Sequence, residues 1–376
     1  MRRKRDVGLG LLVVLNLVLV AVLVLEVRFI MRGSRDEASA PQVDSGAVAV
    51  VDVQQQAEEE PEDQGVPLEE GRITMTLCGS HETYVRTGEE YVEPGCHVRD
   101  REEGNLTSAV EITGSVDTST PGDYVVTYTV TNAAGMTDSC ERVVHVTDDI
   151  EWDDDGIPVM MYHYVYDPAN PPADLNANYV STDELESHLA WLTEEGFYYP
   201  SWAELRAYVD GTHSLPAKSV ILTFDDGEYG FLDYGIPLLV KYQVSATSFT
   251  ECCRDDIEYV LTEYANPYVI FESHSFALHH AGYSGLGHGG AIYDLSEDEL
   301  VDDITSAGDV LGSVDAFAYP YGDVSDVSAA AMDRAGVLCA VTVDYGQVHV
   351  GDNPAALPRV RVSGGNSLEG YQASVW

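Results

Sequence analysis

Hydrophobic positions follow three different patterns along this chain, and each pattern predicts a different kind of structure. Residues 7–25 are almost all Leu, Val, Ala and Gly, which is long enough for a membrane-spanning helix. Residues 73–148 contain short alternating segments that are typical of β-strands. From residue 157 to the C-terminus, apolar runs of strand length alternate with amphipathic helical segments. We therefore expect an anchor, an all-β module and an α/β domain, in that order.

The anchor is predicted within residues 1–30, where a basic tail precedes the apolar run. Basic residues before a span place the N-terminus in the cytoplasm, so the rest of the chain is expected outside the cell membrane. A cleaved signal peptide is the alternative. Its best site, Ala38 to Ala40, lies well beyond the run and is followed by Pro41, which favours an uncleaved single-pass transmembrane helix.

Two segments have the composition of linkers. Residues 31–72 are rich in Ala, Val, Gln, Glu, Asp and Pro without a sustained period, so they are predicted to be disordered. Residues 149–156 form an acidic junction between the two globular parts. Its aspartates are candidate calcium ligands, but the spacing of a calcium loop is not evident, which favours a solvated linker.

The all-β module, residues 73–148, has its clearest signal in one hairpin. Tyr124, Val126, Tyr128 and Val130 occupy alternate positions, the period of a strand with one buried face. A turn at 132–135 leads to a partner strand predicted at 141–146. Gly and Pro punctuate the rest of the module, which indicates a small β-sandwich.

The α/β domain, residues 157–376, shows three helix starts of the Ser-x-x-Glu capping type, at Ser181, Ser201 and Ser296. Apolar runs of strand length accompany them at 159–161, 220–224, 244–249, 269–271 and 337–343. Alternating strands and helices predict parallel strands covered by helices.

Charge and cysteine content narrow the range of functions. The 376 residues include 64 acidic and 19 basic side chains, a formal net charge of −45, and seven of the basic residues lie in the first 35. Such a surface repels phosphates, so nucleic acid is excluded as a partner. The six cysteines permit disulfides in an exported chain but do not fix their pairing.

Candidate chemistry begins at Asp225 and Asp226, which follow an apolar run. Adjacent carboxylates beside a buried strand are costly unless a cation or a proton-transfer role holds them there. Asp-Asp-Gly alone is often only a turn. Here His274 and His279 follow, and with one carboxylate they make a three-ligand metal site with open positions.

Further motifs lie at 317–322 (Phe-Ala-Tyr-Pro-Tyr-Gly) and 357–360 (Leu-Pro-Arg-Val). Together with Thr-Phe-Asp-Asp-Gly at 223–227 and the segment 158–165, they resemble the polysaccharide deacetylases of the NodB type, carbohydrate esterase family 4. The resemblance implies a distorted (β/α) barrel with fewer than eight repeats and chemistry at the C-terminal strand ends. Segments of the all-β module resemble the immunoglobulin-like modules of bacterial surface proteins.

By this resemblance Asp226, His274 and His279 bind a divalent metal. Zinc is expected first, and Co²⁺, Mn²⁺, Ni²⁺ and Fe²⁺ are alternatives. His280 competes with His279 for the ligand role. Asp225 is the implied general base.

The resemblance also assigns the backbone N–H of Tyr321 to the oxyanion. A rigid turn that packs two aromatic rings is the structural alternative for this motif.

Two departures from the family pattern affect catalysis. Many members have Arg where this chain has Ala318, and that Arg orients the base. Many also have a late His, the acid that protonates the leaving amine, where this chain reads Leu357 to Arg361. We hypothesise that His163, at the end of the first barrel strand, is the acid instead. A hydrogen-bonded imidazole in the rim is the structural alternative.

These inferences predict a metal-dependent hydrolase that removes N-acetyl groups from an extracytoplasmic polysaccharide and releases acetate. The substrate expected is peptidoglycan or a glycan similar to poly-N-acetylglucosamine. A weakly active glycan-binding surface protein and a polysaccharide O-acetyl esterase are alternatives. A two-histidine, one-carboxylate iron oxygenase uses the same ligand types, but Asp225 and the surface location disfavour it.

Overall fold

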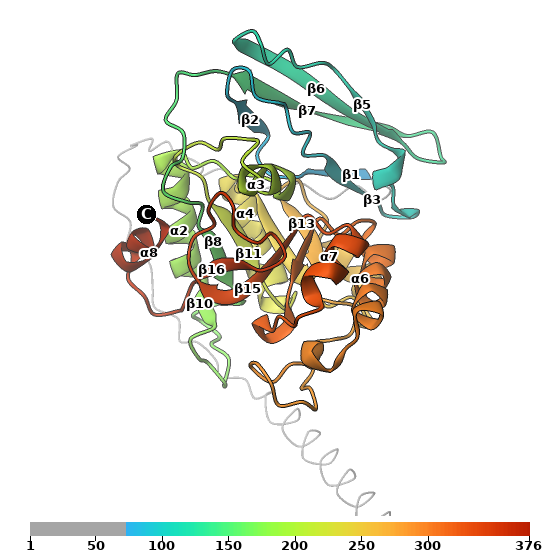
Figure 1. Ribbon diagram of the computed structural model, residues 1–376, viewed down its shortest axis with the longest axis vertical. Coiled ribbons are helices and arrows are strands. Elements are labelled where there is room, and N and C mark those ends of the chain that lie inside the picture. Colours follow the sequence, from blue (N-terminus) through green and yellow to red (C-terminus); the bar gives the residue numbers. More distant parts are fainter. Residues whose placement is uncertain (1–72) are drawn as a thin grey trace, which may run out of the picture. The chain divides into compact units, whose positions relative to one another are not determined.

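The computed structural model describes residues 73–376, which form a β-sandwich followed by an α/β barrel (Figure 1). The predicted anchor at 7–25 and the predicted linker at 31–72 lie outside the described residues. Within residues 73–376, no helix combines the length and the apolar character needed to cross a bilayer.

The sandwich consists of two sheets. One has the order β1-β3-β4 and the other the order β2-β7-β6-β5. The strands are β1 (Ile73–Leu77), β2 (Glu82–Val85), β3 (Cys96–Asp100), β4 (Gly104–Asn105), β5 (Glu111–Thr113), β6 (Gly122–Thr131) and β7 (Thr137–Val146), with a short helix η1 (Thr107–Ala109). The prediction of a small sandwich is therefore confirmed.

The β6–β7 hairpin shows the predicted alternation. Val126, Tyr128 and Val130 are buried between more exposed neighbours. The return strand was predicted from residue 141 but begins at Thr137, where Thr131 is its partner. Backbone pairing therefore continues past the apolar pattern into polar residues.

The barrel is closed by seven strands in the order β11-β12-β13-β14-β15-β16-β8, and every neighbouring pair is parallel. Its strands are β8 (Val159–Tyr162), β11 (Ile221–Phe224), β12 (Ala246–Thr250), β13 (Val269–Ser273), β14 (Ala316–Ala318), β15 (Cys339–Tyr345) and β16 (Leu357–Arg361). A short parallel pair, β9 (Tyr164–Tyr166) and β10 (Tyr179–Ser181), lies outside it. The prediction of a barrel with fewer than eight repeats is confirmed.

Helices surround the barrel strands (Figure 1). They are α2 (Thr182–Glu195), α3 (Trp202–Val209), η2 (Phe231–Gly235), α4 (Ile236–Tyr242), α5 (Ile257–Glu263), η3 (Ala291–Asp294), α6 (Glu297–Leu311), η4 (Pro320–Gly322), α7 (Ser328–Ala335) and α8 (Leu368–Val375). The three capping boxes at Ser181, Ser201 and Ser296 are all formed, and they start α2, α3 and α6. Local sequence alone therefore sets these three helix starts.

The sandwich and the barrel make buried polar contacts with each other. Thr83 Oγ1 donates to Glu204 Oε1 at 2.5 Å, and Thr76 Oγ1 donates to the carbonyl of Asn266 at 2.5 Å. The acidic segment between them is also bound, since Tyr208 Oη donates to Asp153 Oδ2 at 2.6 Å. The expectation of a freely solvated linker is therefore wrong at Asp153.

Candidate active site

The candidate residues meet on one rim of the barrel. Asp225 and Asp226 directly follow β11, His274 directly follows β13, and Tyr321 lies in η4 after β14. Because all these strands are parallel, their C-terminal ends open on the same side. The fold thus brings together residues that lie up to about a hundred positions apart.

Asp226, His274 and His279 form the group that the sequence predicts as metal ligands. The Nε2 atoms of both histidines lie 3.3 Å from Asp226 Oδ1, and the three potential ligand atoms lie within 4.8 Å of one another. His274 Nδ1 lies 2.8 Å from the carbonyl of Ala318. A proton on Nδ1, donated to that carbonyl, leaves the Nε2 lone pair directed at the group.

A tight turn brings His279 back to His274, as the five-residue spacing requires. Ser275 has φ 78°, and the N–H of Leu278 donates to Ser275 Oγ at 2.9 Å. The carboxylate of Asp303 accepts hydrogen bonds from the backbone N–H groups of Phe276 and Ala277, at 2.8 and 2.9 Å. His280 points elsewhere, with Nδ1 3.0 Å from the carbonyl of Ala281, and is not part of the group.

Strained backbone accompanies the site. Asp226, Ser275 and Tyr321 are three of the four non-glycine residues with positive φ among residues 73–376. Such conformations cost on the order of 1 kcal/mol each and persist where the surrounding structure fixes them. Positive φ therefore occurs in three different rim segments, and one of these residues, Asp226, is itself a candidate metal ligand.

Asp225 is held by a buried arginine. Arg359 Nη1 lies 2.8 Å from Asp225 Oδ1 and Arg359 Nη2 lies 2.7 Å from Oδ2, and the two side chains are 0% and 3% exposed. Burial raises the pKa of Asp225, but Arg359 opposes this so strongly that the pKa lies below its ordinary value. Asp225 is thus a fixed, ionised carboxylate next to the candidate ligands.

Arg359 therefore makes the contact with Asp225 that the family resemblance assigns to an arginine at the position of Ala318. It comes from β16, where it also donates from Nε to the carbonyl of Thr342 at 2.8 Å. The sequence placed Arg359 in the 357–360 motif, where it departs from the family pattern, and assigned it no role. The available signal was an arginine two positions after Leu357 on the same, buried side of a strand.

Tyr164 is a second residue that sequence reasoning did not assign. Its hydroxyl donates to Asp226 Oδ2 at 2.8 Å, which leaves Oδ1 facing the two histidines. Tyr164 lies in the 158–165 segment that supports the family resemblance. The sequence therefore indicated that this segment matters, but it did not indicate that Tyr164 contacts Asp226.

His163 lies near both aspartates, whose charges raise its pKa. Burial outweighs them, so the pKa of His163 lies below its ordinary value. Its Nδ1 is buried and has no hydrogen-bond partner among the described residues. Its role as the acid stays a prediction.

Tyr321 has an exposed ring that stacks on the ring of His279, with centroids 5.2 Å apart. Its φ of 63° belongs to the turn at Pro320 to Gly322 that follows β14. Of the two tyrosine rings in this motif, Tyr319 is buried and packs on Phe317, whereas Tyr321 stacks on His279. The oxyanion role of the Tyr321 N–H stays a prediction.

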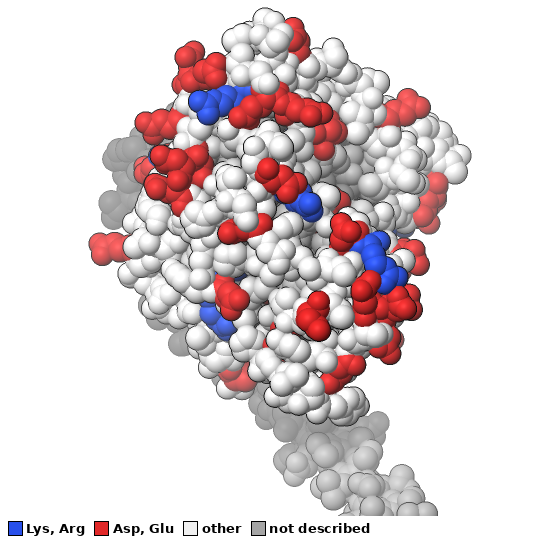
Figure 2. Space-filling model, in the orientation of Figure 1, with Lys and Arg blue, Asp and Glu red and all other residues white. Residues whose placement is uncertain are grey.

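The donor set fits a divalent metal. One carboxylate oxygen and two imidazole nitrogens are ligands that zinc takes in catalytic sites, and a hydrogen bond behind His274 orients one of them. Acidic side chains are spread over the face shown in Figure 2, and basic side chains are few on this face.

Comparisons with known proteins relate the sandwich and the barrel to two known families. The family model described as "Bacterial surface protein, Ig-like domain" matches residues 75–146, and the polysaccharide deacetylase family model matches residues 212–340. YxkH of Bacillus subtilis (strain 168), whose name assigns it provisionally to the polysaccharide deacetylases, is 25% identical over 225 residues. That alignment covers 58% of this chain and 76% of the relative.

One further sequence relative and one solved structure are also similar to this chain. The poly-beta-1,6-N-acetyl-D-glucosamine N-deacetylase of Escherichia coli (strain K12) is 37% identical over 92 residues, which cover 24% of this chain and 13% of that protein. The Streptococcus pyogenes deacetylase PplD in complex with acetate has a TM-score of 0.51 and 24% identity. It covers 59% of this chain and 98% of its own, and it supports the fold alone.

Proposed function

This chain carries a polysaccharide deacetylase domain behind a bacterial immunoglobulin-like domain, and we propose that it hydrolyses N-acetyl groups on an extracytoplasmic polysaccharide. The observation that carries the proposal is the pairing of two features on one rim. The Asp226 group offers three metal ligands, and the neighbouring Asp225 is an ionised carboxylate held by Arg359.

Asp226, His274 and His279 would hold the metal. When bound, a divalent metal supplies Lewis acidity toward the acetyl carbonyl and toward water. Tyr164 fixes one oxygen of Asp226, and the backbone carbonyl of Ala318 fixes the ring of His274. These contacts hold the ligand atoms in place before any substrate arrives.

Asp225 would accept the proton of the attacking water. The water oxygen adds to the acetyl carbon, the C–N bond breaks, and the products are acetate and a free amine. Arg359 keeps Asp225 ionised and fixed in orientation, and Asp225 still has lone pairs free beyond its two bonds to the guanidinium.

The leaving amine needs a proton, and two residues are candidates to supply it. His163 lies near the aspartates with an unpaired Nδ1, and Asp225 can return the proton it accepted. Loss of His163 distinguishes them, because only the first route needs the imidazole.

The substrate we propose first is a β-1,6-linked polymer of N-acetylglucosamine, supported by the name of the Escherichia coli relative. Peptidoglycan is the second candidate. The enzyme is proposed to act outside the cell membrane, with residues 7–25 as its anchor, which the basic tail before that run supports.

Arg359 weakens the alternative of a glycan-binding protein with little activity. That alternative depended on a missing arginine and a missing histidine, and the buried pair with Asp225 supplies an arginine. An O-acetyl esterase would use the same chemistry, so the test below includes an O-acetylated substrate.

The test is an acetate-release assay with a panel of substrates: poly-β-1,6-N-acetylglucosamine, chitin oligomers, peptidoglycan and an O-acetylated glycan. We expect release from an N-acetylated substrate, loss of release on chelation and recovery with Zn²⁺ or Co²⁺. Release from the O-acetylated glycan alone would replace the proposal by the esterase. Glycan binding without any release would replace it by the binding protein.

A further inference from the structure

A second group of ligating side chains lies where the sandwich meets the barrel, away from the rim. Cys78 follows β1 and His97 lies in β3, both in the sandwich, whereas Asp315 directly precedes the barrel strand β14. One ligand atom of each lies within 4.8 Å of the others. The Cys78 residue is only 3% exposed.

Glu272 contributes an independent observation. This residue of β13 is 0% exposed, and its Oε2 accepts from the backbone N–H groups of Asp315 and Ala316 at 3.1 and 3.2 Å. Its Oε1 has no hydrogen-bond partner among the described residues and lies 3.8 Å from His97 Nε2. A buried carboxylate oxygen without a donor is costly unless a cation or a proton meets it.

We propose that a structural zinc ion binds at this junction and joins the sandwich to the barrel. Its ligands are two side chains from each domain: Cys78, His97, Glu272 and Asp315. One thiolate, one imidazole and two carboxylates are all ligand types that zinc binds, and four of them close a tetrahedral site without leaving an open position.

The distances suit this assignment. Zinc bonds of about 2.0 to 2.3 Å place tetrahedral ligand atoms about 3.3 to 3.8 Å apart. His97 Nε2 and Glu272 Oε1 lie 3.8 Å apart, at the upper end of this range. The ligand atoms of Cys78, His97 and Asp315 lie within 4.8 Å of one another, so they reach tetrahedral separations by shifts of no more than about 1.5 Å per pair.

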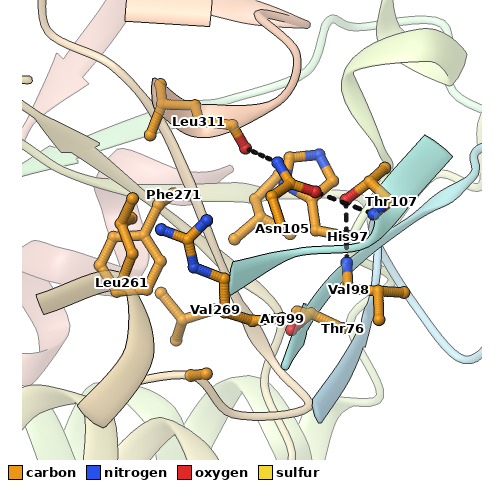
Figure 3. A pocket seen from close by; sticks show the side chains of 12 residues that line it. Thr76, His97, Val98, Arg99, Asn105, Thr107, Leu261, Val269, Phe271 and Leu311 are labelled. Carbon is orange, nitrogen blue, oxygen red and sulfur yellow. Dashed lines mark hydrogen bonds between the residues drawn. The ribbon is translucent and has the colours of Figure 1, made fainter. Parts of the chain in front are cut away.

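A small cavity of about 40 Å³ adjoins the group and provides space beside it (Figure 3). His97 lies in its wall next to Asn105, whose side chain donates to the carbonyl of Leu311 at 2.7 Å. Asn105 belongs to the sandwich and Leu311 to the barrel, so this contact also crosses the junction.

Cobalt substitution tests the proposal, because a cobalt–thiolate bond gives a charge-transfer absorption in the near ultraviolet. The rim group has no sulfur donor, so a band that depends on Cys78 reports the junction and not the rim. We expect the reduced full-length chain to show the band at saturating Co²⁺. Cys78→Ser should lose it, and Cys339→Ser should keep it. Cys339 is a suitable control because it is equally buried in the same apolar cluster, with Sγ 3.7 Å from the carbonyl of Trp202.

Zinc content gives a second readout that is independent of activity. We expect two zinc ions per wild-type chain and one in each of Cys78→Ser, Glu272→Gln and Asp226→Ala. In the Asp226→Ala protein, added zinc should still raise the melting temperature, and this rise should disappear when Cys78→Ser is added.

Absence of the cobalt band in the wild-type protein would overturn the proposal without relying on any variant. So would a band that persists in Cys78→Ser. Either result would mean that the junction is a cluster of protonated side chains without a metal ion. Failure of the rim site to release acetate leaves the band unaffected, so the two proposals fail separately.

Discussion

Arg359 offers the sharpest prediction about the rim. Replacing it with methionine leaves the Asp225 carboxylate buried without its cation and removes hydrogen bonds to Thr223 and Thr342. Breaking a buried ion pair from one side typically costs about 3 to 5 kcal/mol. For a domain of this size that corresponds to a fall in melting temperature on the order of 10 °C.

Arg361→Met is the matched control. Arg361 lies on the same strand, carries the same charge and is exposed, so its loss should change stability by no more than about 0.5 kcal/mol. Thermal unfolding by circular dichroism measures both variants. Adding Asp225→Asn to Arg359→Met should restore part of the lost stability, because no unpaired charge then remains buried.

The Arg359→Met deficit should depend on pH. The folded-state pKa of Asp225 lies below its ordinary value, so the pair contributes fully above about pH 3.9, the unfolded value. As the pH falls toward the folded-state pKa, this contribution is lost and the deficit narrows. An Arg359→Met protein as stable as Arg361→Met at pH 7 would refute the reasoning.

The remaining predictions concern the other rim residues and the N-terminus. Asp226→Ala should lose both bound metal and turnover, whereas Asp225→Asn should keep the metal and lose turnover; equal metal loss in both would show that their roles are not divided. His163→Ala should lower turnover by about a hundredfold with metal content unchanged, and near-normal turnover with an intact alkaline limb would favour Asp225 returning the proton. In cell fractionation the protein should stay with the membranes, whereas recovery in the medium with a new N-terminus after Ala40 would show that the anchor is cleaved.

Structural features that depend on residues close together in the sequence could be predicted from it. The helix starts at Ser181, Ser201 and Ser296 each depend on a serine and a glutamate three positions later, so the signal and the contact coincide. The alternation of strands and helices predicted parallel strands covered by helices, and the family resemblance predicted that they form a barrel with Asp225, Asp226 and His274 at the C-terminal strand ends.

Contacts between distant residues could not be predicted in this way. Arg359 and Asp225 are 134 positions apart, and Tyr164 and Asp226 are 62 apart, so no local pattern links either pair. The strand β16 was also not predicted, because Pro358 and Arg359 interrupt its apolar run. The junction cluster depends on the packing of the sandwich against the barrel, and sequence patterning does not specify that interface.

The central claim is that the rim hydrolyses an amide, and its most direct test compares the two products. Poly-β-1,6-N-acetylglucosamine is incubated with metal-loaded wild-type protein and with Asp226→Ala, and acetate and new primary amines are measured in the same sample. The account predicts equal amounts of acetate and amine from the wild-type protein and neither from the variant. Acetate without amine, or equal release by Asp226→Ala, would contradict it.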